Sequence, residues 1–268
     1  MRMINRFSLI IMLCFLAINL FGQDAQIDYT ASKKDWGFSI TPYALFASQS
    51  TDVGGEKIRQ SFNDLASVTN SGFQIVGKAR YKRLSVSFDG TFANLGDEAT
   101  KGPLVIKLNI NQNILDFKFG YMVYENFEFN EDEILKGWAL NLNVGTKYWK
   151  NKIGLDYSLI FNDNIIDNGS IEEVQHWWDL MVGINTNFVI SKKFMLSVGG
   201  NIGGFGIGNS SKFAHDFTYL NSFKLSKLII INAGFRSFKY ERVDGMGEEE
   251  LKTTVSVLGP VLGVSFVW

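Results

Sequence analysis

The sequence has little cysteine, proline or histidine, with one, three and two of these residues in a chain of 268. The single cysteine, Cys14, cannot form an intrachain disulfide, and no thiol chemistry remains once the N-terminal segment is removed. Neither sign of charge is in excess, because 26 basic residues stand against 27 acidic ones. No nucleic-acid partner is therefore expected. The 26 glycines and 23 phenylalanines beside so few prolines favour β-strands over disorder.

Long apolar runs are also missing, apart from one at the N-terminus. It extends from Phe7 to Phe21, follows Arg2 and Arg6, and ends in small and polar residues. Because this run is shorter than the ~20 residues that a membrane-spanning helix needs, it predicts a cleaved secretory signal over residues 1–22 rather than an anchor. The residues before Cys14 are too large for a lipoprotein processing site.

The rest of the chain alternates apolar and polar residues with a period of two, which is typical of strands that have one apolar face. We expect residues 23–34 to form a periplasmic N-terminal segment and residues 35–268 to form one β domain. Ten segments carry the pattern: 36–46, 72–81, 83–93, 104–121, 138–149, 177–190, 194–204, 217–225, 228–238 and 256–268.

Long and short connections alternate between these segments. The long ones are expected at residues 48–70, 162–175 and 241–253, and the short ones near Lys82, at 191–193 and near Ser226. Membrane barrels show this alternation, because their outer loops are long and their periplasmic turns short. Only the turn that follows Tyr121 is longer than the rule expects.

Two local irregularities are expected within the pattern. In the segment 104–121 the apolar parity switches between Gln112 and Leu115, which predicts a one-residue β-bulge. In the first outer connection, residues 56–68 predict a short helix that caps the lumen, lies on the membrane surface or packs on the barrel rim. Its apolar stripe consists of Ile58, Phe62, Leu65 and Ala66.

The composition of the polar face indicates which face meets lipid. A soluble barrel would place Lys and Glu on a water-facing side. Here the polar positions are mostly asparagines with Ser, Thr and Gly between them: Asn109, Asn111, Asn141, Asn143, Asn185, Asn187, Asn201 and Asn232. Small neutral groups suit a confined hydrated interior, so the apolar face is expected to meet lipid. The predicted fold class is all-β: a transmembrane antiparallel up-and-down β-barrel of about ten strands, between 8 and 12, with a short helix in the first outer loop.

The C-terminus supports a location in the bacterial outer membrane after signal-dependent export. Val264, Phe266 and Trp268 alternate up to a terminal aromatic residue. This pattern resembles the C-terminal signal that outer-membrane barrels present to their assembly machinery. We therefore expect two partners, the barrel assembly machinery and outer-membrane lipid.

Five segments together resemble an uncharacterised family of Gram-negative outer-membrane β-barrels of porin-like or OmpA-like type. They are residues 62–95, 176–188, 196–211, 231–240 and 258–268. The resemblance implies a barrel with a short helical element in its first outer loop, and it implies no assigned activity. The chain departs from the family pattern at three positions, with Asn201 in place of aspartate, Asn185 in place of arginine and Leu180 in place of proline.

Charged residues at inward positions are the main candidate site. They are Lys78, Arg80, Asp89, Lys107, Asp116, Lys118, Lys147, Asp179 and Arg236. In a narrow barrel, opposite charges are expected to pair across the lumen and close it, because an unpaired charge away from water is unfavourable. The alternative is a selectivity lining for a small pore. A barrel of this strand number has an interior that side chains can fill, which favours the structural network.

The glycine-rich run at residues 199–208 has no phosphate-binding signature, because it continues a strand instead of opening a helix. Gly199 and Gly203 are expected to face the lumen and leave room for a bulky neighbour such as Trp177 or Arg236. Gly204 begins the passage into a loop. We interpret the run as a thin place in the barrel wall.

The two histidines offer a weaker catalytic hypothesis. His176 with Ser170, or His215 with Ser210 and Asp216, could form nucleophile and base pairs at the outer rim. No nucleophile motif accompanies them, and ordinary loop histidines are the alternative. The acidic loop runs lack calcium-loop spacing, so neither a metal site nor a cofactor is predicted.

Three functions remain open from the sequence. The first is a structural or narrow-pore outer-membrane barrel with a largely side-chain-filled polar lumen. The second is a lipid-active or ligand-binding barrel with its site at the outer rim. The third is a soluble exported barrel that binds a ligand as lipocalins do. No substrate, transported solute or bound ligand follows from the sequence.

Overall fold

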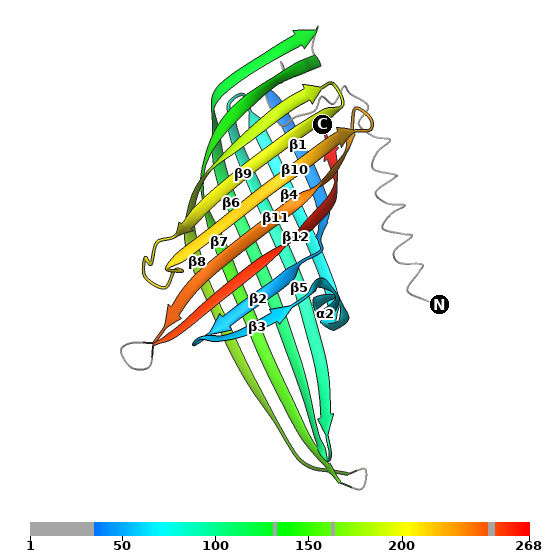
Figure 1. Ribbon diagram of the computed structural model, residues 1–268, viewed down its shortest axis with the longest axis vertical. Coiled ribbons are helices and arrows are strands. Elements are labelled where there is room, and N and C mark those ends of the chain that lie inside the picture. Colours follow the sequence, from blue (N-terminus) through cyan, green and yellow to red (C-terminus); the bar gives the residue numbers. More distant parts are fainter. Residues whose placement is uncertain (1–34, 131–132, 162–163, 246–249) are drawn as a thin grey trace.

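A computed structural model describes residues 35–130, 133–161, 164–245 and 250–268, and they form an antiparallel β-barrel (Figure 1). The predicted signal peptide and the predicted periplasmic segment lie outside the described residues. Among the described residues, no helix is long and apolar enough to cross a membrane.

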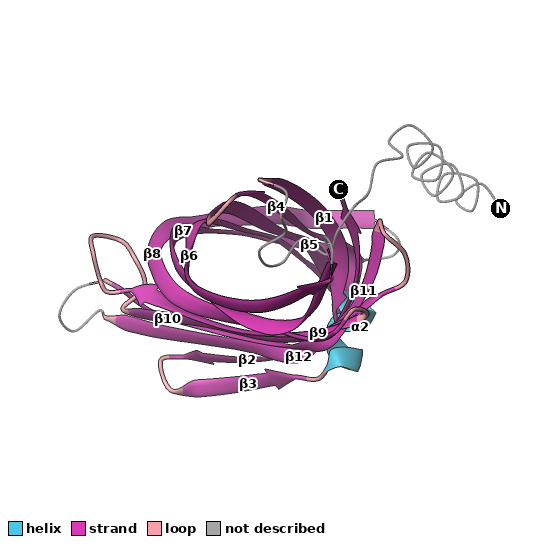
Figure 2. Cartoon of the chain, turned by 90° about the horizontal axis from the view of Figure 1, so that it is seen from above, coloured by secondary structure: helices cyan, strands magenta, loops and turns pink. Residues whose placement is uncertain are grey.

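Ten strands close into one ring, and each pairs with the next in antiparallel order. In ring order they are β1 (Trp36–Leu45), β4 (Thr69–Tyr81), β5 (Leu84–Lys101), β6 (Leu104–Asn130), β7 (Glu133–Phe161), β8 (Asn164–Ser191), β9 (Phe194–Gly204), β10 (Phe213–Lys224), β11 (Ile229–Asp244) and β12 (Leu251–Val267). Seen from above, the ribbons of these strands surround a lumen (Figure 2). The predicted all-β up-and-down barrel of about ten strands is confirmed.

The first and last strands close the ring. β1 pairs with β12 from Ser39↔Val267 to Leu45↔Val261. Past this ladder, the backbones of Phe38 and Trp268 exchange hydrogen bonds of 3.0 and 3.1 Å, and their rings stack at a centroid distance of 6.1 Å. The C-terminal Trp268 therefore takes part in the pairing of β1 with β12 that closes the ring. Val264, Phe266 and Trp268 all lie at outward positions of the wall.

The two ends of the barrel differ, and we name them by their connections. The short-turn end carries the Lys82 turn, the β8–β9 and β10–β11 turns and the C-terminus, while the loop end carries the long β1–β4 and β9–β10 connections. Lys82 takes a φ of 51° in the predicted tight hairpin between β4 and β5.

The first long connection contains more structure than the sequence indicates. A hairpin of β2 (Ser48–Val53) and β3 (Glu56–Gln60) pairs onto the loop end of β12, from Leu258↔Ser48 to Thr253↔Val53. Helix α2 (Phe62–Val68) follows, with Ser61 as its N-cap. The predicted helix is confirmed but shorter, because the reciprocal capping bonds between Ser61 and Asp64 start it there. Ile58 consequently belongs to β3 and not to the helical stripe.

An apolar band encircles the ring on its outer face. Half-exposed side chains make it up, among them Val86, Phe119, Val144, Ile184 and Leu262. Exposed aromatic residues border the band at both ends: Trp36, Tyr81, Tyr121, Trp138 and Trp268 at the short-turn end, and Phe73, Phe92, Trp178 and Phe213 at the loop end. Buried polar residues such as Ser39, Asn187 and Asn232 lie on the inner face. Apolar outside, polar inside and aromatic girdles at both borders are typical of a lipid-embedded barrel.

Beyond the band, β5 to β8 continue past the loop end of the other strands (Figure 1). In this extension the two faces exchange character. The outer face carries polar groups such as the exposed pair Lys107–Glu98, with Nζ and Oε2 3.1 Å apart. The inner face carries apolar cross-strand pairs such as Ile110↔Ile153 and Leu108↔Leu155. Water replaces lipid outside the band, so the apolar side chains turn inward.

This inversion explains why the predicted β-bulge between Gln112 and Leu115 is wrong. The β5–β6 pairing runs without a register shift from Leu84↔Tyr121 to Lys101↔Leu104. The parity switch in the sequence therefore marks the border of the apolar band, and the backbone needs no extra residue. The register shifts of β6 against β7 lie elsewhere, at Met122/Tyr124 and Glu128/Phe129.

Several predicted loops are strands instead. The long turn after Tyr121 continues β6 to Asn130, and β7 resumes at Glu133. The expected loop at 162–175 is mostly the loop-end part of β8, which pairs with β7 from Phe161↔Asn164 onward. These segments are rich in polar residues although they are paired strands, so polarity alone was not evidence for a loop.

Candidate functional site

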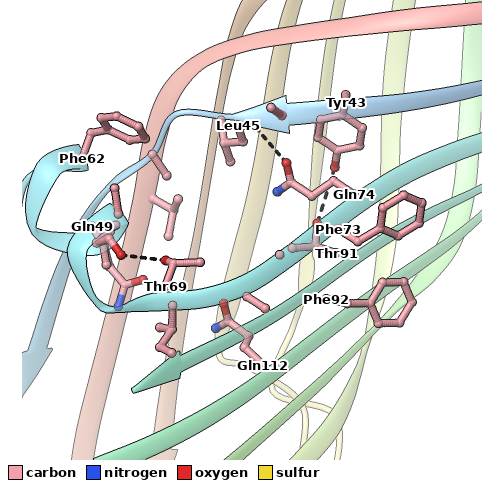
Figure 3. A pocket seen from close by; sticks show the side chains of 18 of the residues that line it. Tyr43, Leu45, Gln49, Phe62, Thr69, Phe73, Gln74, Thr91, Phe92 and Gln112 are labelled. Atoms are coloured by element: carbon pink, nitrogen blue, oxygen red, sulfur yellow. Dashed lines mark hydrogen bonds between the residues drawn. The ribbon is translucent and has the colours of Figure 1, made fainter. Parts of the chain in front are cut away.

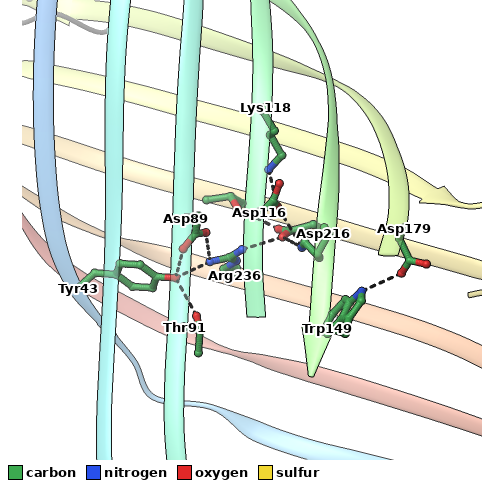
Figure 4. Close-up of polar contacts among 11 residues, drawn as sticks. Tyr43, Asp89, Thr91, Asp116, Lys118, Trp149, Asp179, Asp216 and Arg236 are labelled. Carbon is green, nitrogen blue, oxygen red and sulfur yellow. Dashed lines mark hydrogen bonds and ion pairs between the residues drawn. The ribbon is translucent and has the colours of Figure 1, made fainter. Parts of the chain in front are cut away.

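A network of ion pairs joins inward-facing side chains of several strands inside the barrel (Figure 4). Its centre is Asp216 on β10, whose Oδ2 lies 2.6 Å from Nζ of Lys147 on β7 and 2.7 Å from Nη2 of Arg236 on β11. Nη1 of Arg236 also lies 2.7 Å from Oδ2 of Asp89 on β5. The network thereby connects strands that are far apart around the ring.

A third carboxylate joins from β6. Oδ2 of Asp116 lies 2.9 Å from Nζ of Lys118 and 3.3 Å from Nζ of Lys147. With this pair the network holds three cations and three carboxylates, so its formal charge is balanced. The side chains of Lys147, Asp116 and Asp216 are at most 2% exposed. Buried charges are tolerated only when they are paired in this way.

Tyr43 extends the network to β1, the first strand of the ring. Its hydroxyl donates to Oδ1 of Asp89 at 2.8 Å and accepts from Nη1 of Arg236 at 2.7 Å. Thr91 lies 3.4 Å from the same hydroxyl. Six strands of the ring therefore contribute side chains to the network: β1, β5, β6, β7, β10 and β11.

A second carboxylate site lies nearby and uses neutral donors. Oδ2 of Asp179 accepts from Nε1 of Trp149 and from Oγ of Ser211, each at 2.8 Å, while Oδ1 accepts from the Ser211 backbone N–H at 2.7 Å. Nε1 of Trp177 donates to Ser211 Oγ at 3.0 Å. Asp179 is fully buried, and these donors replace the water that its carboxylate has lost.

A layer of aromatic side chains lies inside the barrel, on the loop side of the network. The rings of Trp149 and Trp177 stack at 5.9 Å, and Tyr240 packs against both at 4.8 and 5.2 Å. Phe238 contacts Trp149 at 6.0 Å. These residues form one buried cluster with Ile114, Met181, Ala214, Val255 and Val257. The lumen therefore contains a charged layer and an apolar layer in succession.

Toward the short-turn end the interior is lined by neutral polar ladders. Asn187 Nδ2 donates to Asn185 Oδ1 at 2.8 Å, and Ser197 Oγ donates to Asn187 Oδ1 at 2.5 Å. A matching chain joins Ser222, Asn232 and Ser265 through bonds of 2.7 Å. Of the asparagines on which the choice of faces rested, Asn141, Asn143, Asn185, Asn187, Asn201 and Asn232 lie at inward positions. Asn109 and Asn111 do not, because they share the outward parity of Lys107 in the β5–β8 extension.

The structure brings together Asp89, Asp116, Lys118, Lys147 and Arg236 from the predicted charge set. Asp179 lies beside them in its own donor set. Arg80 is buried on β4 and donates from Nη1 to the carbonyl oxygen of Lys82 at 2.9 Å, and Lys78 lies at an inward position of the same strand. Lys107 is wrongly predicted as an interior charge, because it lies on the outer face of the β5–β8 extension.

Asp216, the centre of the network, is absent from the predicted charge set and was predicted only as a companion of His215. Adjacent strand residues point to opposite faces, so the two side chains cannot share a site. Phe217 and Tyr219 occupy outward positions, so the same alternation places Asp216 inward. Tyr43 carried a similar signal, since it lies on the polar face of β1.

The glycine-rich strand makes room for different neighbours than predicted. A Cβ at Gly203 would collide with the Leu180 carbonyl oxygen and with Sδ of Met181, which is fully buried. A Cβ at Gly199 would lie 2.9 Å from Nδ2 of Asn185. The close contacts are therefore with β8 and not with Trp177 or Arg236. Gly204 ends β9 with a φ of 84°.

The histidines are not brought together with the proposed serines. His215 faces outward opposite Ile202 and Lys239, whereas Asp216 faces inward. Ser210 Oγ donates to the Gly204 carbonyl oxygen at 2.8 Å. His176 and Ser170 lie on one strand six residues apart, which is about 20 Å. In the described part of the chain, no group of three or more acidic, histidine or cysteine side chains is placed to hold a metal ion.

The closed ring, the apolar outer band and the polar interior define an outer-membrane type of β-barrel. The chain is similar in structure to the outer membrane protease OmpT from Escherichia coli, with a TM-score of 0.53 and 11% identity over 90% of this chain and 99% of that one. At this identity the similarity shows the fold alone.

Two further similarities are weaker. The attachment invasion locus protein Ail of Yersinia pestis gives a TM-score of 0.37 and 13% identity over 88% of this chain and 100% of that one. CarO of Acinetobacter baumannii gives 0.30 and 9% over 84% and 98%. No protein-family model matches the chain, and no curated protein is similar to it in sequence.

Proposed function

We propose that the protein is an integral barrel of the bacterial outer membrane whose lumen is closed, so that its role is structural and not that of an open pore. The observation that carries this proposal is the buried set Lys147, Asp216 and Arg236, which spans the lumen between β7, β10 and β11. Each charge is already neutralised by a partner within the wall. A passing ion would therefore find paired groups in place of a selectivity ring.

The aromatic layer supports the same role. An ion that reached it would have to shed its hydration shell among Trp149, Trp177 and Tyr240, which is very unfavourable in an apolar environment. Two successive barriers of different chemistry argue against a narrow pore for small solutes.

The proposed orientation follows from the connections. Short turns belong to the periplasmic end of outer-membrane barrels and long connections to the cell exterior. The tall β5–β8 sheet, the β2–β3 hairpin and α2 would then project outside the cell, and Trp268 would lie at the periplasmic side. That position suits recognition of Val264, Phe266 and Trp268 by the barrel assembly machinery.

A liposome-swelling assay tests the closed lumen. Liposomes that contain the refolded protein are diluted into isotonic solutions of a small sugar or amino acid, and their turbidity is followed. We expect the rate of swelling to equal that of protein-free liposomes. Swelling that rises with the amount of protein and falls with the size of the solute would show an open pore and overturn the proposal.

A further inference from the structure

At the loop end, the barrel wall divides between β1 and β4, and we call this place the seam. These strands pair from Trp36↔Tyr81 only as far as Tyr43↔Gln74. Past this point β1 stays on β12 as far as Leu45↔Val261, and the chain then continues along β12 as β2. β4 instead stays on β5 up to Thr69↔Leu95. Two strands that are paired from the short-turn end as far as Tyr43 therefore separate toward the loop end.

A side chain replaces the missing ladder at the point of separation. The Leu45 backbone N–H donates to Oε1 of Gln74 at 2.8 Å, where a β4 carbonyl would otherwise accept. Helix α2 lies across the seam, and its Phe62 packs on Phe46 with the ring centroids 5.4 Å apart. The Leu45–Gln74 hydrogen bond and the Phe46–Phe62 ring contact therefore hold the chain at the place where β1 and β4 separate.

A pocket of about 400 Å³ occupies this seam (Figure 3). Inward-facing residues of the wall line it, including Leu95, Phe238 and Val257, and so do the outward-facing Phe73 and Phe92. The lining therefore continues from the lumen, beside the aromatic layer, to the outer surface of the barrel. α2 covers it with Phe62, Leu65 and Ala66.

The chemistry of the lining selects an uncharged apolar ligand. No charged side chain contributes to it. Its six polar side chains each already make a hydrogen bond. The Tyr43 hydroxyl bonds within the network and to Thr91, Gln74 Oε1 accepts from Leu45, and Gln112 Nε2 donates to Asn151 Oδ1 at 3.2 Å. Gln49 Nε2 donates to Thr51, and the Thr69 hydroxyl donates to the Leu65 carbonyl oxygen. Few polar atoms remain to orient a sugar, a peptide or an ion. The volume lies within the ~300–1,000 Å³ that is common for small-molecule sites.

The place of the pocket identifies the source of that ligand. Phe73 and Phe92 are cross-strand partners, 53% and 37% exposed, and they belong to the border of the lipid-facing band. The mouth of the pocket is therefore continuous with the surface that meets lipid. We infer that the seam is a lateral binding site for one acyl chain of a membrane lipid, which enters between β1 and β4 under α2. This site goes beyond the closed lumen and does not depend on it.

Photo-crosslinking in lipid nanodiscs tests the site. The probe is a phosphatidylethanolamine with a diazirine at the end of one acyl chain, and the adducts are mapped by mass spectrometry after illumination. We expect adducts at Leu45, Leu65 and Leu95 that saturate as the fraction of probe rises. Adducts at Phe119 and Val144 in the lipid-facing band are expected to rise linearly, because bulk lipid contacts them.

Two variants of α2 provide the matched comparison. Ala66→Trp places an indole in the pocket, whereas Ser67→Trp adds the same bulk to the next residue, which does not line it. Adducts at Leu45 and Leu95 should fall at least about tenfold in A66W, the change that ~1.4 kcal/mol of lost binding produces, and should be unchanged in S67W. Heat-modifiable migration on a gel confirms that both variants fold.

Equal adduct levels in the two variants, or adducts at Leu45 and Leu95 that never saturate in the wild type, would overturn the site. A failure of the closed-lumen proposal would appear instead as solute influx, with these adducts still present.

Discussion

Lys147 on β7 reaches across the lumen to Asp216 on β10, and its Nζ lies 2.6 Å from Oδ2 of the carboxylate. Both side chains are almost completely buried, so neither charge can be solvated if its partner is lost. Arg236 approaches the same carboxylate oxygen from β11. Side chains from three strands, β7, β10 and β11, therefore meet at Oδ2 of Asp216.

Removing one partner should destabilise the barrel strongly. We expect Lys147→Met to lower the free energy of unfolding by about 3–5 kcal/mol, because Asp116 and Asp216 lose a buried counter-ion. Urea unfolding from lipid bilayers, followed by tryptophan fluorescence, measures the change. Lys136→Met is the control, since the Lys136–Glu128 pair is more than 60% exposed and should contribute less than about 1 kcal/mol. Equal effects of the two variants would contradict the network.

The donor set of Asp179 gives a second prediction. Trp149→Phe keeps an aromatic ring but removes the Nε1 donor to Oδ2, and should lower the free energy of unfolding by about 1–3 kcal/mol. Trp178→Phe is the matched control, because the neighbouring Trp178 side chain faces outward and is 53% exposed. The same urea series compares them. A loss in W178F as large as that in W149F would rule out a special role for the Asp179 contact.

Two glycines of β9 offer a steric test. Gly203→Ala would force a methyl group against the Leu180 carbonyl and Met181, and overpacking of this kind is unfavourable by about 1–3 kcal/mol. Gly200→Ala meets no atom within 4 Å. We expect the first variant to lose its heat-resistant folded band at a lower temperature than the wild type, and the second to keep it. Identical melting of both variants would show that β8 and β9 do not approach as described.

The capping box of α2 predicts a local pH effect. Hydrogen bonds from the Ser61 hydroxyl and backbone N–H lower the pKa of the Asp64 carboxyl. Because the carboxyl pKa is lower in the folded state, the two bonds stabilise the helix at pH values above the pKa of the unfolded chain. This contribution is lost as the pH falls through the pKa of the folded state. Ser61→Ala should therefore move the midpoint of the Asp64 carboxyl resonance to higher pH. Asn63→Ala leaves both bonds in place, and its midpoint should match the wild type; a shift there would contradict the assignment.

The alternation of the sequence predicted the ring well, because a strand in lipid must separate apolar from polar residues at every step. It could not show whether lipid or water surrounds a given part of a strand. The change of parity near Gln112 therefore looked like a bulge, although it marks the point where β6 leaves the apolar band. The polar residues of a paired sheet outside the membrane likewise made residues 162–175 look like a loop.

The interior network was only partly predictable for a different reason. Inward positions of Asp89, Lys147 and Arg236 followed from their strands, but their partners depend on register around the whole ring. The seam at Tyr43↔Gln74 has no local signal either, because it arises where β1 and β4 take different neighbours. Only the three-dimensional pairing places Gln74 against the Leu45 amide.

Single-channel recording in planar bilayers tests the closed lumen most directly. The wild-type barrel should insert and leave the current at the baseline of the bare bilayer at moderate voltages. The double variant Arg236→Ala, Trp149→Ala removes one side chain from the charged layer and one from the aromatic layer. It should then produce discrete conductance steps. Steady ohmic steps from the wild-type protein would contradict the account, because ions would then pass the network that Lys147, Asp216 and Arg236 form.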